Sequence, residues 1–168
     1  NIFVTPKQIG NFDSFEELFD HFPPLLSAYQ PTFYIEQAAD VARIHDERQR
    51  DRFLVKMLYI LLVKRLESSW FSFHSTAGKI LAHHQNALDK IHLYEQGKKK
   101  IEIEDVFEQD LFDEDEQEDL ADDFTLGKKR PISLAEIDRA GKLANFKNDL
   151  KKDMDALDLL HQNLLKFS

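Results

Sequence analysis

The feature that most constrains this chain is a stretch of about 49 residues, 46–94, that contains no proline and a single glycine, Gly78. Eight apolar residues and one histidine recur along it in steps of three and four: Leu62, Leu66, Trp70, Phe73, Ala77, Ile80, His84, Leu88 and Ile91. This spacing places them on one face of an α-helix. A single helix of this length would extend roughly 73 Å. We expect a kink or break at Ser68-Ser69 or at Gly78.

A second helical pattern occupies residues 133–168. Ser133-Leu134-Ala135-Glu136, just after Pro131, forms a capping box that starts it. The stripe that follows comprises Leu143, Lys147, Leu150, Met154, Leu157, His161 and Leu164, broadened by Phe146 and Leu160. Two striped helices joined by one connecting segment bury their stripes by packing antiparallel. The sequence therefore predicts an all-α fold built on a long, coiled-coil-like antiparallel helical hairpin.

The chain of 168 residues is long enough for one domain. We expect an irregular, aromatic-rich segment with short helices at 1–45, a long helix at 46–94, an acidic tip loop at 95–132 and a C-terminal helix at 133–168. Ser14 and Glu17 form a capping box in the first segment. Its eight aromatic residues are expected to pack on the long helices or on an absent surface. Because the chain starts at Asn1 and its last helix has no stop signal, we expect a piece excised from a larger protein.

The net charge of -9 is concentrated in one segment. Residues 101–127 hold 13 of the 31 acidic residues and no basic one, which leaves 18 acidic against 22 basic residues elsewhere. Blocks of like charge are typical of solvated loops. The alternative is an acidic strip that mimics nucleic acid or binds a basic partner. A calcium loop is not favoured, because residues 113–118 lack the glycine that an EF-hand has at its sixth position.

Several classes of chemistry lack their motifs. There is no cysteine, no phosphate-binding loop and no Gly-x-Ser-x-Gly elbow. We therefore assign no catalytic residue and no cofactor to this chain. The longest apolar run, 57–63, is far shorter than the ~20 residues of a membrane span. We expect a cytoplasmic protein without membrane contact.

Metal binding is the sharpest enzymatic alternative. Asp89-x-x-His92 and Asp158-x-x-His161 each place a carboxylate and an imidazole on one helical face, as di-metal helical bundles do. In the expected hairpin the two motifs lie roughly 30 Å apart along the helices. We therefore predict no metal site, and a helical metalloenzyme is the least favoured hypothesis.

Two sets of polar residues on the long helix are candidate contact sites. Arg48, Arg52 and Lys56 step by four and share one face, which indicates either a solvated face or contacts to a DNA backbone. Lys64, Arg65, Glu67, Ser68 and Ser69 follow the apolar run directly. Buried charges are costly unless they are paired. This second set therefore indicates either a polar partner surface or a helix break with surface pairing.

The same region carries a family resemblance. Residues 52–73, with Lys64-Arg65-Leu66-Glu67-Ser68-Ser69 at their centre, resemble the helical region between the two RecA-like lobes of bacterial Swi/Snf-type helicase-like ATPases. The likeness is strongest over residues 49–81. It extends more weakly to Tyr29-Gln30-Pro31-Thr32-Phe33-Tyr34 and to the last helix, with Asp153, Asp155, Leu157 and Leu160.

The resemblance implies an accessory protrusion or brace of a DNA-dependent ATPase. ATP, Mg²⁺ and the catalytic motifs would belong to the parent protein, a helicase-like translocase or remodeler. The expected partners are the RecA-like lobes of the same chain, through Lys64, Arg65, Glu67, Ser68 and Ser69, and duplex DNA, through Arg48, Arg52 and Lys56. The alternative is a stand-alone helical interaction protein that uses its acidic loop to bind a basic partner.

Overall fold

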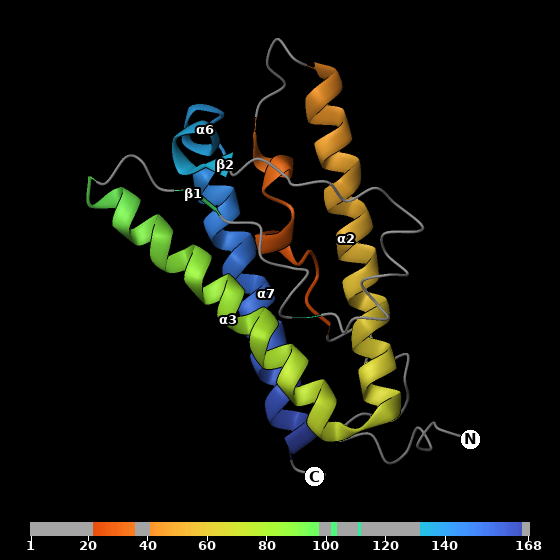
Figure 1. Ribbon diagram of the computed structural model, residues 1–168. Helices are drawn as coiled ribbons and strands as arrows, with labels where there is room; N and C mark the ends of the chain where they lie inside the picture. Colours follow the sequence, from red (N-terminus) through yellow and green to blue (C-terminus); the bar gives the residue numbers. More distant parts are fainter. Residues whose placement is uncertain (1–21, 36–40, 98–101, 104–110, 112–131, 166–168) are drawn as a thin grey trace.

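The computed structural model describes residues 22–35, 41–97, 102–103, 111 and 132–165. Two 3-10 turns, η2 (Ser27–Tyr29) and η3 (Pro31–Tyr34), precede the long helices α2 (Val41–Ser68) and α3 (Trp70–Glu95). A short strand pair, β1 (Glu102–Ile103) and β2 (Ile132–Ser133), leads into α6 (Leu134–Arg139) and α7 (Leu143–Leu165). The all-α fold expected from the sequence is confirmed (Figure 1).

The helix expected over 46–94 is interrupted by one residue. Ser69 has an extended backbone, with φ -166° and ψ 148°. Its backbone N–H donates to the Arg65 carbonyl at 2.9 Å and so closes α2. Its Oγ accepts the N–H of Ser72 at 2.9 Å and so caps α3. The break expected at Ser68-Ser69 is therefore present, whereas Gly78 lies inside α3, and the first long helix begins at Val41 rather than at Asp46.

Three long helices replace the expected pair. Figure 1 shows α3 and α7 running antiparallel across one another, with α2 on the other side of the molecule. Residues 22–35 lie between α2 and the α3–α7 pair, and both 3-10 turns contact α2 and α7. The reversal at Ser69 is the reason, because it leaves only the second half of the expected long helix beside α7.

The buried face of α3 agrees with the expected stripe. Phe73, Ile80, His84 and Ile91 are fully buried, while Trp70 at its start is partly exposed. The buried face of α7 differs by one position from the expected one. It comprises Phe146, Leu150, Asp153, Leu157 and Leu160, whereas Lys147, Met154 and His161 are only partly buried. A carboxylate, Asp153, therefore occupies a position in the middle of the apolar seam.

Two hydrophobic clusters fill the interior. One joins α2, the first half of α3 and the end of α7 with Phe22, Leu26, Tyr29 and Leu111. The other joins the end of α3 with α6, the start of α7 and Tyr34. The N-terminal aromatic residues were expected to pack on the long helices. This is confirmed for Phe22, Tyr29 and Tyr34, while Phe33 is 51% exposed.

The ends of the 95–132 segment are held together by antiparallel pairing of Glu102 with Ser133 and of Ile103 with Ile132. Ser133 and Glu136 form the expected capping box. Gly141, at φ +73°, separates α6 from α7, so the helix expected over 133–168 is two helices. Most of the acidic segment 101–127 and the capping box of Ser14 and Glu17 lie outside the described residues. Of the helices described, none combines the length and apolarity that crossing a membrane requires.

Candidate functional site

The buried carboxylate of Asp153 accepts four hydrogen bonds from residues 25–27. Its Oδ1 accepts the backbone N–H groups of Leu25 and Leu26, at 2.9 and 3.1 Å. Its Oδ2 accepts the N–H and the hydroxyl of Ser27, at 2.8 and 2.6 Å. The side chain projects from α7 into the turn that starts η2, where Leu26 has a left-handed backbone with φ 49°. These four hydrogen bonds satisfy the donors of a turn that is otherwise strained.

His84 completes this buried cluster from α3. Its Nδ1 lies 2.9 Å from the carbonyl oxygen of Ile80, and since a carbonyl only accepts, Nδ1 carries a hydrogen. Its Nε2 lies 3.5 Å from the backbone nitrogen of Ala28 and 3.6 Å from Oδ2 of Asp153. A neutral ring accepts from Ala28, and a protonated ring donates to Asp153. In both states His84 connects α3 to η2 and α7.

The hydrogen bonds decide the charge of Asp153. Burial by itself raises the pKa of a carboxyl group. The hydrogen bonds from His84, from the Ser27 hydroxyl and from backbone N–H groups outweigh that effect, and the pKa of Asp153 is lowered below its ordinary value. The group is therefore an ionised carboxylate at neutral pH.

Ser27, His84 and Asp153 contain the residue types of a hydrolytic triad, but their geometry is different. In a triad the serine hydroxyl bonds to histidine and the histidine bonds to the carboxylate. Here the Ser27 hydroxyl donates directly to Asp153, and all three residues are 0% exposed. A substrate cannot reach this hydroxyl. The arrangement fixes residues 25–28 to α3 and α7, and we call these three residues the α7 clasp.

A second set of contacts fixes η3 to α2. Oδ2 of the buried Asp51 accepts the N–H and hydroxyl of Thr32, at 3.3 and 2.5 Å. Arg48 donates from Nε to the Thr32 carbonyl at 3.1 Å and from Nη2 to the Ile35 carbonyl at 2.9 Å. Asp51 thus binds the start of η3 and Arg48 its end. We call Arg48, Asp51 and Thr32 the α2 clasp.

Tyr34 adds a contact between η3 and α7. Its hydroxyl donates to Oδ2 of Asp149 at 2.6 Å, and its ring packs 4.8 Å from that of Phe146. Burial and the hydrogen bond to Asp149 raise the pKa of Tyr34 far above its ordinary value. The hydroxyl is therefore protonated at neutral pH and donates to Asp149.

The three possible DNA contacts, Arg48, Arg52 and Lys56, differ in exposure and in hydrogen bonding. The guanidinium of Arg48 is engaged in the α2 clasp, whereas Arg52 and Lys56 are exposed. The exposed residues of α2 form one stripe, which we call the α2 face: Gln49, Arg52, Lys56, Ile60, Lys64 and Ser68. Within residues 47–68, no acidic side chain belongs to the exposed class. The α2 face is thus positive in a chain whose net charge is negative.

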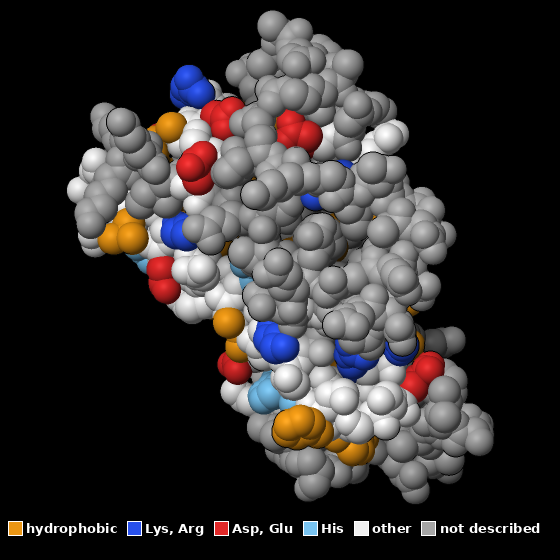
Figure 2. Space-filling model, in the orientation of Figure 1, with side chains coloured by type: hydrophobic (Ala, Val, Ile, Leu, Met, Phe, Trp, Pro, Cys, Tyr) orange, Lys and Arg blue, Asp and Glu red, His pale blue; other side chains and the backbone are white. Residues whose placement is uncertain are grey.

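The second expected set, at 64–69, lies where α2 turns into α3. Lys64 is exposed, and Nη2 of Arg65 lies 3.5 Å from the Leu111 carbonyl. Ser69 has the structural role described above, as the cap of α3. Phe71, two residues further on, is 82% exposed, and Figure 2 shows hydrophobic side chains on the surface at this lower end of the molecule. A contact of this corner with RecA-like lobes stays a prediction.

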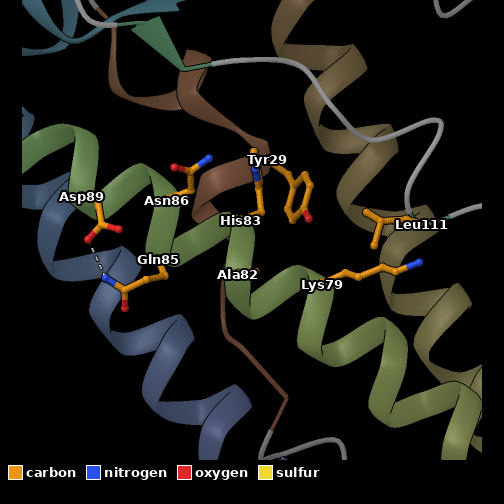
Figure 3. Close-up of a pocket in the computed structure, with 8 residues that line it drawn as sticks. All are labelled: Tyr29, Lys79, Ala82, His83, Gln85, Asn86, Asp89 and Leu111. Carbon is orange, nitrogen blue, oxygen red and sulfur yellow. Dashed lines mark hydrogen bonds between the residues drawn. The ribbon is translucent and has the colours of Figure 1, made fainter.

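A groove of about 650 Å³ opens over α3 beside the α7 clasp (Figure 3). The ring of His83 packs against that of Tyr29 at 4.5 Å between ring centres and an interplanar angle of 36°. Lys79 and Asn86 lie on either side of His83 along the helix. Nε2 of Gln85 donates to Oδ1 of Asp89 at 2.8 Å at one end of the groove. Its lining combines apolar side chains, such as Leu111 and Ala82, with polar ones of both charge signs. Among these lining residues, no nucleophile is aligned with a base.

The histidines of the two motifs that were considered as metal ligands, His92 and His161, have other neighbours. Nδ1 of His92 lies 3.5 Å from Oε1 of Glu95, in the same helix. Nδ1 of His161 lies 3.0 Å from Nδ1 of His74, across the α3–α7 contact. Within the described part of the chain, no three His, Asp or Glu side chains gather as a metal site would require.

Comparison with known proteins gives no match: no family model, no curated protein and no solved structure is significantly similar to this chain.

Sequence reasoning did not find Asp153 or Asp51 as interior residues. The signal was present for Asp153, since it continues the spacing of Leu150, Leu157 and Leu160. A charged residue in an apolar register indicates a buried partner. Its partner lies 126 residues away, at Ser27, and no local pattern identifies it.

Proposed function

We propose that this chain is a helical brace of a DNA-dependent ATPase of the Swi/Snf type, and that the α2 face contacts the DNA backbone. The observation that carries the DNA contact is the exposure of Arg52, Lys56 and Lys64 on one face of α2 without an exposed acidic neighbour within residues 47–68. The assignment to the ATPase class rests on the sequence resemblance around residues 52–73.

The spacing of these cations suits a nucleic-acid strand. Arg52 and Lys56 are separated by roughly 6 Å along the helix axis, and Lys56 and Lys64 by roughly 12 Å. One strand of B-DNA advances 3.4 Å per nucleotide along the duplex axis. The cations therefore span about five phosphates. Such contacts depend on salt and carry no base sequence.

The two clasps support the role of a brace. The α2 clasp fixes η3 to α2, and the α7 clasp fixes η2 to α3 and α7. Both use buried carboxylates that bind backbone N–H groups, so the three long helices and residues 22–35 form one connected unit. A load applied to α2 through bound DNA would be carried to the α3–α7 pair, and from there to the lobes of the parent enzyme.

The test is a binding titration of the chain with a fluorescein-labelled duplex of about 20 base pairs between 50 and 200 mM salt. We expect weak binding whose slope of log K against log salt falls by about 2 in the double variant Arg52→Glu/Lys56→Glu. The matched control is Lys151→Glu/Lys152→Glu, which makes the same charge change on exposed residues of α7. Equal losses in both variants would indicate a net-charge effect and would contradict the proposal.

A second test of the proposal is to sequence the gene on both sides of the region that encodes this chain. A phosphate-loop motif and an Asp-Glu-x-His box upstream, with an arginine-bearing lobe downstream, are expected. If the chain binds no DNA and the flanking sequence lacks these motifs, the alternative is favoured: a stand-alone helical protein whose acidic segment binds a basic partner.

A further inference from the structure

A second surface feature lies on the opposite helix pair and is unrelated to the α2 face. A groove of about 420 Å³ runs between α3 and α7 on their solvent side. Its floor and walls comprise Gly78, Leu81 and Ala82 from α3 and Met154, Asp155 and Asp158 from α7. We call it the α3–α7 groove. Figure 2 shows acidic and hydrophobic side chains together along the edge where α3 overlies α7.

We infer that the α3–α7 groove binds an amphipathic α-helix that carries Lys or Arg beside its apolar face. Leu81 and Met154 are only partly buried, so both offer apolar surface to an incoming side chain. From Gly78 to Gln85 the groove follows α3 for roughly 10 Å, which is about two helical turns. A helix laid along two antiparallel helices buries its own apolar face in the same way.

The packing of α3 against α7 gives no reason for a glycine at position 78, in the middle of a helix. Glycine inside a helix is less favourable than alanine. A Cβ placed on Gly78 would meet no atom of the described residues within 4 Å. The described part of the chain therefore has room for a side chain at this position. A partner whose backbone approaches α3 closely at Gly78 and Ala82 accounts for the small residues at this four-residue spacing.

The charge of the groove selects the partner. Asp155 and Asp158 are exposed on its α7 wall, and Asp89 lies just beyond Gln85 at one end. Among the described residues that line it, none is Lys or Arg. Asp158 accepts a hydrogen bond from Gln162 at 3.2 Å, which holds its carboxylate in place on the wall. A basic helix complements these carboxylates, whereas an acidic helix or a nucleic-acid backbone is repelled.

The test uses a labelled helical peptide of about 14 residues that contains only Leu and Lys, with Leu on one face. We expect the chain to bind it, with chemical-shift changes at Gly78, Ala82 and Asp155 in amide NMR spectra. Gly78→Leu fills the groove and is expected to weaken binding at least about tenfold. Gly78→Ala is the matched control, expected to retain binding and to raise Tm by about 2–4 °C.

A second variant protects the test against misfolding of Gly78→Leu. Asp155→Asn/Asp158→Asn removes two surface charges and is expected to weaken binding about tenfold and to reduce its salt dependence. Equal affinity of the wild-type chain and Gly78→Leu, or peptide binding that maps outside the groove, would overturn the inference. So would unchanged affinity in the Asn double variant. The DNA titration is unaffected by these results, because the α2 face and the groove share no residue.

Discussion

Oδ2 of Asp153 lies 2.6 Å from the hydroxyl oxygen of Ser27, across 126 residues of sequence and with both side chains fully buried. This contact, with the three backbone hydrogen bonds to the same carboxylate, connects the N-terminal segment to the last helix. Because a single carboxylate accepts all four hydrogen bonds, the stability of the fold depends on this charged group.

Asp153→Asn is therefore expected to lower the free energy of unfolding by about 3 kcal/mol, because an amide offers only one acceptor to donors that surround both carboxylate oxygens. Urea unfolding followed by circular dichroism measures this. Asp155→Asn, on the exposed side of the same helix, is expected to change stability by no more than about 0.5 kcal/mol. Similar losses in the two variants would show that the carboxylate is not a buried acceptor.

Acid is expected to remove the contribution of Asp153. Burial raises the pKa of Asp153, whereas the hydrogen bonds from His84, Ser27 and the backbone lower it. The hydrogen bonds have the larger combined effect, so the pKa lies below its ordinary value. The unfolded chain then binds the proton more readily than the folded chain. The stability difference between the wild type and Asp153→Asn should be constant above about pH 4 and should shrink as pH falls below that value. Urea midpoints measured at several pH values test this, and a difference that grows on acidification would contradict the sign.

His74 adds an acid sensitivity at higher pH. Burial, followed by the positive charge of His161, lowers the pKa of His74. The unfolded chain therefore takes up this proton at a higher pH than the folded chain, and stability is expected to decline as pH falls through about 6.5. His74→Gln should flatten the dependence of Tm on pH between about 7 and 5. His92→Gln, an exposed position of the same helix, should leave that dependence in place.

Arg48 and Arg52 are expected to have different roles although they lie one turn apart. Arg48→Gln removes the hydrogen bonds to the Thr32 and Ile35 carbonyls and should lower the free energy of unfolding by about 1–2 kcal/mol. Arg52→Gln should leave stability within about 0.5 kcal/mol and should weaken DNA binding instead. Thermal unfolding and the binding titration together separate the two roles, and an unstable Arg52→Gln variant would refute the assignment.

The cap at Ser69 is expected to matter more than the serine before it. Ser69→Ala removes the acceptor for the Ser72 N–H and should cost about 1 kcal/mol, seen as a lower urea midpoint. Ser68→Ala, at an exposed position at the end of α2, should be neutral or slightly stabilising because alanine favours the helix. If both variants behave alike, the helix break does not depend on the Ser69 hydroxyl.

The helices were predictable because their apolar residues recur with the helical period. Phe73, Ile80 and Ile91 lie on the stripe and are buried as expected. Ser68-Ser69 was one of the two places where a kink or break was expected, and Gly78, the other, lies inside α3. The consequence of the break could not be derived, since one extended residue at Ser69 reverses the chain and local sequence does not encode the angle between the helices that follow.

The buried carboxylates of Asp51 and Asp153 were not predicted from the sequence. Asp51 and Asp153 are charged, and charged residues are rarely buried without a partner. The sequence pattern therefore assigned neither residue to the interior. Their partners are backbone N–H groups in and before the 3-10 turns, together with the hydroxyls of Ser27 and Thr32. Backbone N–H groups have no residue-type signature. Arg48 is one of the three possible DNA contacts, and its hydrogen bonds to the Thr32 and Ile35 carbonyls were not predictable from the spacing either.

The 126 residues that separate Ser27 from Asp153 also determine when the contact between them can form during synthesis. A ribosome adds about 5–20 residues per second. The turn at 25–28 therefore waits roughly 6–25 s before its carboxylate partner has been made. During that interval α2 and α3 can pair locally, while Phe22, Leu26 and Tyr29 lack the α7 contacts that they have in the finished protein. The docking of residues 22–29 on α7 accordingly has to wait until α7 has been synthesised.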